Sequence, residues 1–203
     1  MKSQNLSNSL IESIFSSNTK DLYLDVADAL LESNIDKEVL GNIPIVSSIY
    51  NLYKSAVSIS DRMFLKKILG FLSELDRVDK EKIASFYKKI NTDEKFKRNV
   101  GDKLMFIVDK CEDDEKSKIV AKIFGAYFCK EIDYNDFLTL ARAIDFLSVN
   151  DIDDFKTRKE WDFSGDANLV NAGLLWQELT SGDERYDSYP YVVNRQQKVD
   201  TIF

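Results

Sequence analysis

The sequence contains no histidine, and this absence narrows the available chemistry more than any other feature. It excludes Ser-His-Asp and Cys-His catalytic arrangements, zinc or haem sites with histidine ligands, and the usual proton carrier near neutral pH. Two cysteines alone cannot complete a structural zinc site. The glycine-rich phosphate-binding motifs and the Gly-x-Ser-x-Gly motif are absent as well. We therefore predict no cofactor, no metal and no catalytic residue.

Glycine and proline are scarce, with 7 and 2 residues in a chain of 203. Sheet-rich folds need many turns, so this scarcity favours long helices joined by short connections.

Cys111 and Cys129 do not form a disulfide framework, which favours a reducing compartment. The start of the chain does not read as a signal peptide, and no apolar run approaches the roughly 18–20 residues that span a bilayer. We predict a cytoplasmic protein without a membrane partner, and the composition is typical of low-GC bacteria and their phages.

The net charge of −7 is unevenly distributed along the chain. Residues 61–130 carry 17 basic and 13 acidic side chains, whereas residues 131–203 carry 7 basic and 15 acidic ones. Mixed charges on solvated helix faces explain most of this pattern. The alternative is a basic face on residues 61–130 that meets an anionic partner or the acidic end of the same chain.

The stretch from Ile45 to Leu75 is the most apolar part of the chain, and the rest is organised around it. Its apolar residues recur at helical spacing on both sides of a polar break at Ser60-Asp61-Arg62. A stripe this wide must be buried against other helices. It comprises Ile45, Ile49, Leu52, Ala56, Ile59, Phe64, Ile68, Phe71 and Leu75. We predict a mostly α fold, with a multi-helix bundle over residues 1–150 packed around this stretch.

The residue pattern changes after residue 150, and residues 151–203 are predicted to form a small α+β appendage. A short helix would end at Gly173, and aromatic and β-branched residues on both sides of a Gly-containing turn favour a β-hairpin. This helix-plus-hairpin order over residues 166–193 resembles the second half of a winged-helix domain. The resemblance implies that Asn168 and Asn171 lie on a recognition helix and Arg185 on the wing.

Three carboxylate clusters are the only abundant chemical groups: Glu112 to Glu115, Asp133 with Asp136, and Asp151 with Asp153 and Asp154. They could hold Mg²⁺ or Ca²⁺, which prefer oxygen ligands. Helix capping is the alternative explanation, and it fits Asp133 and Asp136 better because Ile132 and Phe137 flank them as a hydrophobic staple would.

Four functional hypotheses remain open from the sequence. The first is a non-enzymatic regulatory protein that would dock on a protein partner, for example in bacterial stress or phage conflict. The second is nucleic-acid binding through Lys88 and Lys89 of the basic region together with Asn168, Asn171 and Arg185. The third is a carboxylate-metal enzyme that acts on phosphates, and the fourth is a homo-oligomeric assembly subunit.

Overall fold

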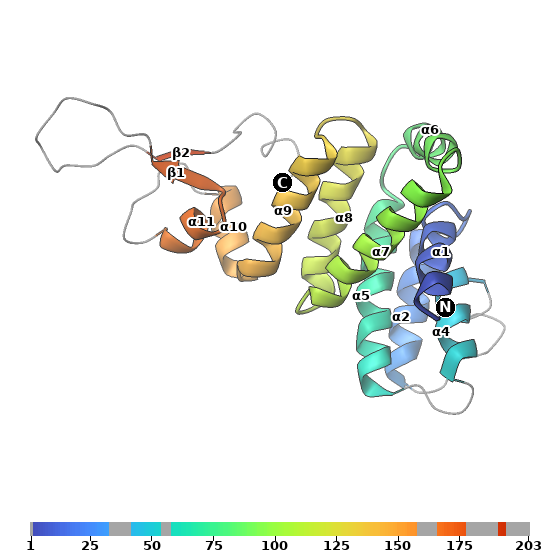
Figure 1. The fold of residues 1–203 in the computed structure, drawn as a ribbon. Coiled ribbons are helices and arrows are strands. Elements are labelled where there is room, and N and C mark those ends of the chain that lie inside the picture. The colour runs from blue at the N-terminus through green and yellow to red at the C-terminus, as the bar shows by residue number, and fades with distance from the viewer. Residues whose placement is uncertain (1, 33–41, 54–57, 158–165, 178–190, 194–203) are drawn as a thin grey trace, which may run out of the picture.

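The computed structural model describes residues 2–32, 42–53, 58–157, 166–177 and 191–193, and this part of the chain is mostly helical, as predicted. Helix and strand labels follow Figure 1. The helices are α1 (Lys2–Ile14), α2 (Lys20–Glu32), α4 (Pro44–Tyr53), α5 (Ile59–Leu75), α6 (Lys80–Ile90), α7 (Glu94–Lys110), α8 (Asp114–Phe128), α9 (Tyr134–Phe146), α10 (Val149–Thr157) and α11 (Ala167–Asn171). The strands are β1 (Leu175–Gln177) and β2 (Tyr191–Val193).

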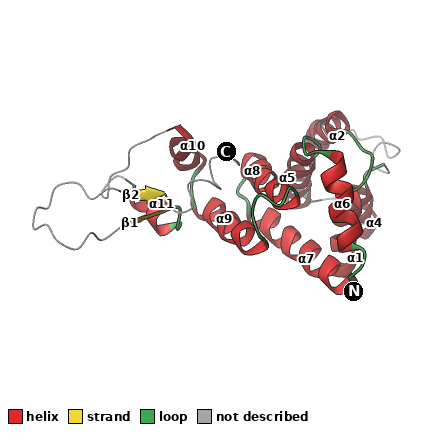
Figure 2. Cartoon of the chain, turned by 90° about the horizontal axis from the view of Figure 1, so that it is seen from above, coloured by secondary structure: helices red, strands yellow, loops and turns green. Residues whose placement is uncertain are grey.

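The helices form an elongated array rather than a ring around one axis. Helix α5 packs between α2 and α8, and α8 packs on α9, so these four follow one another along the array (Figure 1). Helix α1 packs on α4 and α7, and α7 also contacts α5 and α9. Seen from above, α10 and α11 lie at the opposite end of the array from α2 and α4 (Figure 2).

Short polar side chains define where most of these helices begin. Ser58 and Asp61 form a reciprocal capping box at α5, and Asp133 and Asp136 form one at α9, as predicted. At α7 the cap is Asp93, whose carboxylate accepts from the N–H groups of Lys95 and Phe96. Asn91, two residues earlier, ends α6.

The predicted core stretch is confirmed at most positions whose burial is described; Ala56 and the side chain of Leu52 lie outside the described part. Ile45, Val46 and Ile49 of α4 are buried, as are the apolar residues on the inner face of α5. The predicted burial of Ile59 is wrong, because its side chain is 82% exposed. It is the first residue of α5 and directly follows the capping Ser58, so it precedes the turns of α5 that pack against α2 and α8.

The predicted boundary between residues 150 and 151 falls inside α10. Asp151 accepts the backbone N–H of Ser148 at 3.0 Å and caps the start of α10. Farther on, Gly173 takes φ +77° and closes α11: its N–H donates to the carbonyl of Val170, and the N–H of Leu174 donates to that of Leu169. Strands β1 and β2 pair antiparallel.

The described ranges contain no candidate for a membrane-spanning helix. None of the helices there combines the length and the apolar character that crossing a bilayer requires.

Candidate functional site

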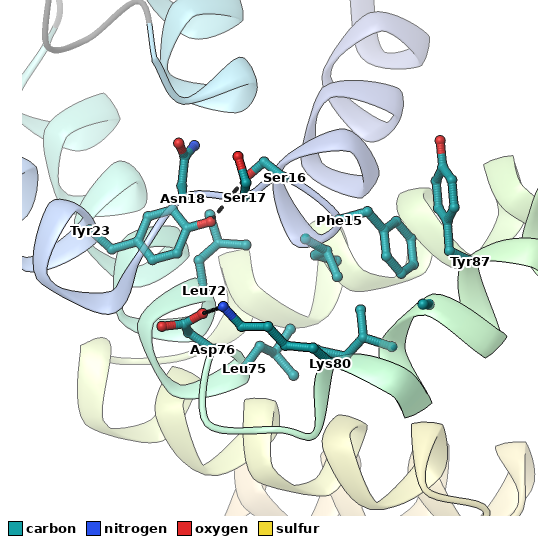
Figure 3. Close-up of a pocket in the computed structure, with 13 residues that line it drawn as sticks. Phe15, Ser16, Ser17, Asn18, Tyr23, Leu72, Leu75, Asp76, Lys80 and Tyr87 are labelled. Carbon is teal, nitrogen blue, oxygen red and sulfur yellow. Dashed lines mark hydrogen bonds and ion pairs between the residues drawn. The ribbon is translucent and has the colours of Figure 1, made fainter.

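The first hollow lies where α1, α2, α5 and α6 meet, and it has a volume of about 260 Å³ (Figure 3). Phe15 and Tyr87 stand at one side, with ring centroids 4.6 Å apart. At the other side, Asp76 accepts the backbone N–H of Lys20 at 2.9 Å and lies 3.9 Å from the Lys80 ammonium. The carboxylate of Asp76 therefore helps to cap the start of α2. The ionisable side chains that line this hollow carry no excess charge.

Tyr23, which also lines this hollow, makes its polar contacts within the fold. Tyr23 donates its phenol proton to the carbonyl of Ser13 at 3.1 Å, and its oxygen lies 3.2 Å from the hydroxyl of Ser16 (Figure 3). Burial raises the pKa of the Tyr23 phenol, so the group stays protonated at neutral pH. These polar contacts join α1 to α2, which gives the hollow a structural explanation.

The second hollow is larger, at about 690 Å³, and lies between α6 and the connection from α8 to α9. Lys89 and Lys130 line it together with Glu131 and Asp133, so the charges of its lining cancel. Lys130 closes α8 with a left-handed backbone, at φ +60°. Two aromatic side chains, Tyr127 and Tyr134, contribute to its wall, with ring centroids 5.5 Å apart.

The third hollow is a groove between α7 and α9 with a volume of about 220 Å³; we call it the α7–α9 groove. Its apolar lining consists of Ile107, Leu138 and Ala141, and the Phe106 side chain stands beside them while remaining 55% exposed. The remaining lining residues are ionisable: Lys103 and Lys110 from α7, and Arg142 and Asp145 from α9.

Phe106 carries a cation on each side along α7. The ammonium of Lys103 lies 5.4 Å from the centre of the ring and that of Lys110 lies 5.5 Å from it. Both are within the range of a cation–π contact. Their spacing of three and four residues follows from the helical repeat, which brings such positions onto one face.

The α7–α9 groove differs from the other two hollows in its charge. Three cations and one carboxylate line it, an excess of two positive charges, and none of the three cations is in an ion pair with a described residue. Its volume lies below the roughly 300–1,000 Å³ of small-molecule sites. It is close to the roughly 150 Å³ cavity that holds one benzene ring. The groove therefore fits one large apolar side chain beside anionic groups.

The structure places the predicted nucleic-acid-binding residues far apart. Lys88 and Lys89 are exposed near the end of α6, whereas Asn168 and Asn171 are exposed on α11. Helices α6 and α11 lie at opposite ends of the array (Figure 1). Arg185 lies outside the described residues. The lysine pair and the asparagine pair thus do not form one continuous patch.

The carboxylate clusters are engaged in helix caps and ion pairs. Asp113 caps α8, and Asp114 contacts Lys66 at 3.1 Å and Lys118 at 2.9 Å. Burial alone would raise the pKa of Asp114, but hydrogen bonds from Lys118 and Lys66 outweigh it and lower the pKa. Hydrogen bonds from Ser148 lower the pKa of Asp151 in the same way. Within the described ranges, no three side chains of Asp, Glu or Cys gather as metal ligands would.

The two cysteines have different surroundings, and this predicts different reactivity. Cys111 is 5% exposed, and burial raises the pKa of its thiol to about 11, whereas Cys129 is half-buried at the end of α8. At pH 8 roughly one Cys111 in a thousand is a thiolate, the form that reacts. We expect Ellman's reagent to modify one thiol rapidly in the native protein, and Cys129→Ser to remove that phase. A rapid phase that persists in Cys129→Ser would contradict the burial of Cys111.

The same shift predicts a dependence of stability on pH. The pKa of Cys111 is higher in the folded state than the roughly 8.5 of an unfolded thiol, so the folded state holds this proton more tightly. The resulting stability is fully present below about pH 8.5 and is lost as the pH rises toward 11. Denaturant unfolding of wild type and Cys111→Ala should therefore converge in stability over that range.

Sequence reasoning did not bring the residues of the α7–α9 groove together as one site. Val100, Leu104 and Val108 recur at helical spacing along α7 and are buried. Phe106 lies off that face, between two lysines at helical spacing. An aromatic residue at a solvent-facing position of an amphipathic helix was the available signal. The contribution of Arg142 required knowing that α9 packs beside α7.

Comparisons of the chain with models of protein families, with curated proteins and with solved structures find no match.

Proposed function

We propose that this chain is a non-enzymatic regulatory protein of the bacterial cytoplasm that acts by docking on a protein partner through the α7–α9 groove. The observation that carries the proposal is the exposed ring of Phe106, held between two lysines above an apolar groove. Aromatic and arginine side chains with apolar surroundings are the residues that dominate binding energy at protein interfaces. Arg142 supplies the arginine from the facing helix.

Photocrosslinking in the cells that encode the chain tests this function. Phe106 is replaced by benzoylphenylalanine, whose photoreactive ring would lie in the interface. We expect discrete protein–protein crosslinks that are absent when the same group replaces Lys82, an exposed residue of α6 outside the groove. Identical crosslinks from both positions, or none from position 106, would contradict docking at the groove.

Nucleic-acid binding is the second candidate, and a specific observation favours it. Lys89 and Lys130 line the 690 Å³ hollow beside Tyr127 and Tyr134, and proteins bind single strands with such cations and aromatic rings, although Glu131 and Asp133 balance the charge here. A winged-helix-like appendage containing α11 and the paired strands would add a separate surface. Binding to random duplexes and to single strands should then weaken steeply with salt, and Lys88→Glu with Lys89→Glu should abolish it. Salt-independent binding, or none at low salt, argues against this candidate.

A homo-oligomer is compatible with the docking function. The mass in solution of the wild-type chain decides this point, and a dimer that Phe106→Ala dissociates would place a second copy in the groove.

A further inference from the structure

We infer that the partner presents an acidic segment with one aromatic or long aliphatic side chain, which enters the α7–α9 groove while its carboxylates meet Lys103, Lys110 and Arg142. This inference rests on the proposed function and specifies the chemistry of the partner. It combines the size of the groove, which fits one large side chain, with the excess of positive charge along its rim.

The three cations of the groove have no ion-pair partner among the described residues. Lys66 of α5 and Lys118 of α8, by contrast, are both paired with Asp114. In the described part of the chain, Asp145 is the single carboxylate that lines the groove with Lys103, Lys110 and Arg142. Complementary charge across an interface speeds association and excludes partners of the same sign. A basic segment would be repelled, and an acidic one would be attracted.

Phe106 and the apolar residues that line the groove with it leave apolar surface uncovered. Ile107 and Leu138 are partly buried, so a side chain that enters the groove would complete their burial. Burial of apolar surface contributes about 25 cal/mol per Å², and a large aromatic side chain buries roughly 150–250 Å². A purely anionic ligand would leave this surface in water. An acidic segment with an apolar anchor uses both features of the groove.

A nucleic acid fits the α7–α9 groove less well than an acidic peptide. Base stacking needs an open ring face, and the ammonium groups of Lys103 and Lys110 lie within 5.5 Å of the Phe106 ring centre. Single-strand sites also follow the backbone over several nucleotides with a continuous basic track. Here the excess of positive charge is confined to three side chains around one ring.

Selection from a random 12-residue peptide library on the full-length protein tests the inference. We expect the enriched peptides to be rich in Asp and Glu around one aromatic or leucine residue. A synthetic peptide of the enriched sequence should bind at least tenfold more weakly to Phe106→Ala and to Arg142→Glu. Lys82→Glu on α6 and Leu24→Ala on α2 are the matched controls, since both residues are exposed and outside the groove, and they should change the affinity less than twofold.

The other outcomes separate the inference from the proposed function. Enriched peptides that are neutral or basic, yet lose binding in Phe106→Ala, would overturn the acidic partner and keep the docking function. Enrichment of nothing, or of peptides that bind all variants equally, would overturn both. A (dT)₁₂ probe that binds wild type more tightly than the peptide and loses binding in Arg142→Glu would replace the acidic peptide with a nucleic acid.

Discussion

Replacement of Phe124 by alanine should lower the free energy of unfolding by about 3–5 kcal/mol, the largest loss we expect from a single side chain. Phe124 is fully buried in α8. Its ring lies 6.0 Å from that of Phe71 in α5, 6.3 Å from that of Phe86 in α6, and 5.1 Å from that of Phe137 in α9. One side chain thus links four helices, and its removal leaves a cavity that none of them can close alone.

The measurement is urea unfolding followed by circular dichroism. Domains of this kind are stable by roughly 5–15 kcal/mol, so a loss of 3–5 kcal/mol should shift the midpoint clearly without a change in slope. If Phe124→Ala does not fold, Phe124→Leu keeps most of the volume and should cost about 1 kcal/mol.

Phe106→Ala is the matched control for Phe124→Ala. It deletes the same aromatic ring from a neighbouring part of the array, but the side chain is 55% exposed. Exposed substitutions usually change the free energy of unfolding by no more than about 0.5 kcal/mol. Equal losses in the two variants would contradict the burial of Phe124. A near-neutral Phe106→Ala would also show that its effect on binding does not come from unfolding.

The sequence predicted the helices well because their signals are local. Apolar periodicity marks the buried faces, and a Ser or Asp before each face marks where helices such as α5 and α9 begin. Ser148 with Asp151 carries the same signal for α10, which begins at Val149.

The relations between distant segments were not predictable in the same way. Asp76 caps the start of α2 from a position 56 residues along the chain. The α7–α9 groove depends on two helices that are separated in sequence by α8. Its positive charge and aromatic ring come from Arg142 of α9 together with Lys103, Phe106 and Lys110 of α7. Periodicity shows which face of a helix is buried. It does not show which other helix covers that face, so a site shared by two helices has no signature in either one.

Replacement of Gly101 by alanine is the second substitution with a large expected effect, and it tests such a relation directly. In an ordinary helix position this change is favourable by about 1 kcal/mol, because alanine is the better helix former. A Cβ at Gly101 would instead lie 2.8 Å from the carbonyl oxygen of Ser7 and 3.2 Å from Ile11, both in α1. Helices α1 and α7 would have to separate, and such overpacking costs about 1–3 kcal/mol.

Gly125→Ala provides the comparison that makes this result informative. Its Cβ would also come within 2.8 Å of another atom, but that atom is a methyl carbon of Val78, a half-buried residue in the connection after α5. A side-chain methyl can rotate away, whereas the Ser7 carbonyl is fixed by the backbone of α1. We therefore expect thermal unfolding to show a lower Tm for Gly101→Ala than for Gly125→Ala. The opposite order would mean that α1 does not approach α7 as closely as Gly101 permits, and that the size of this residue is not what sets the spacing of the two helices.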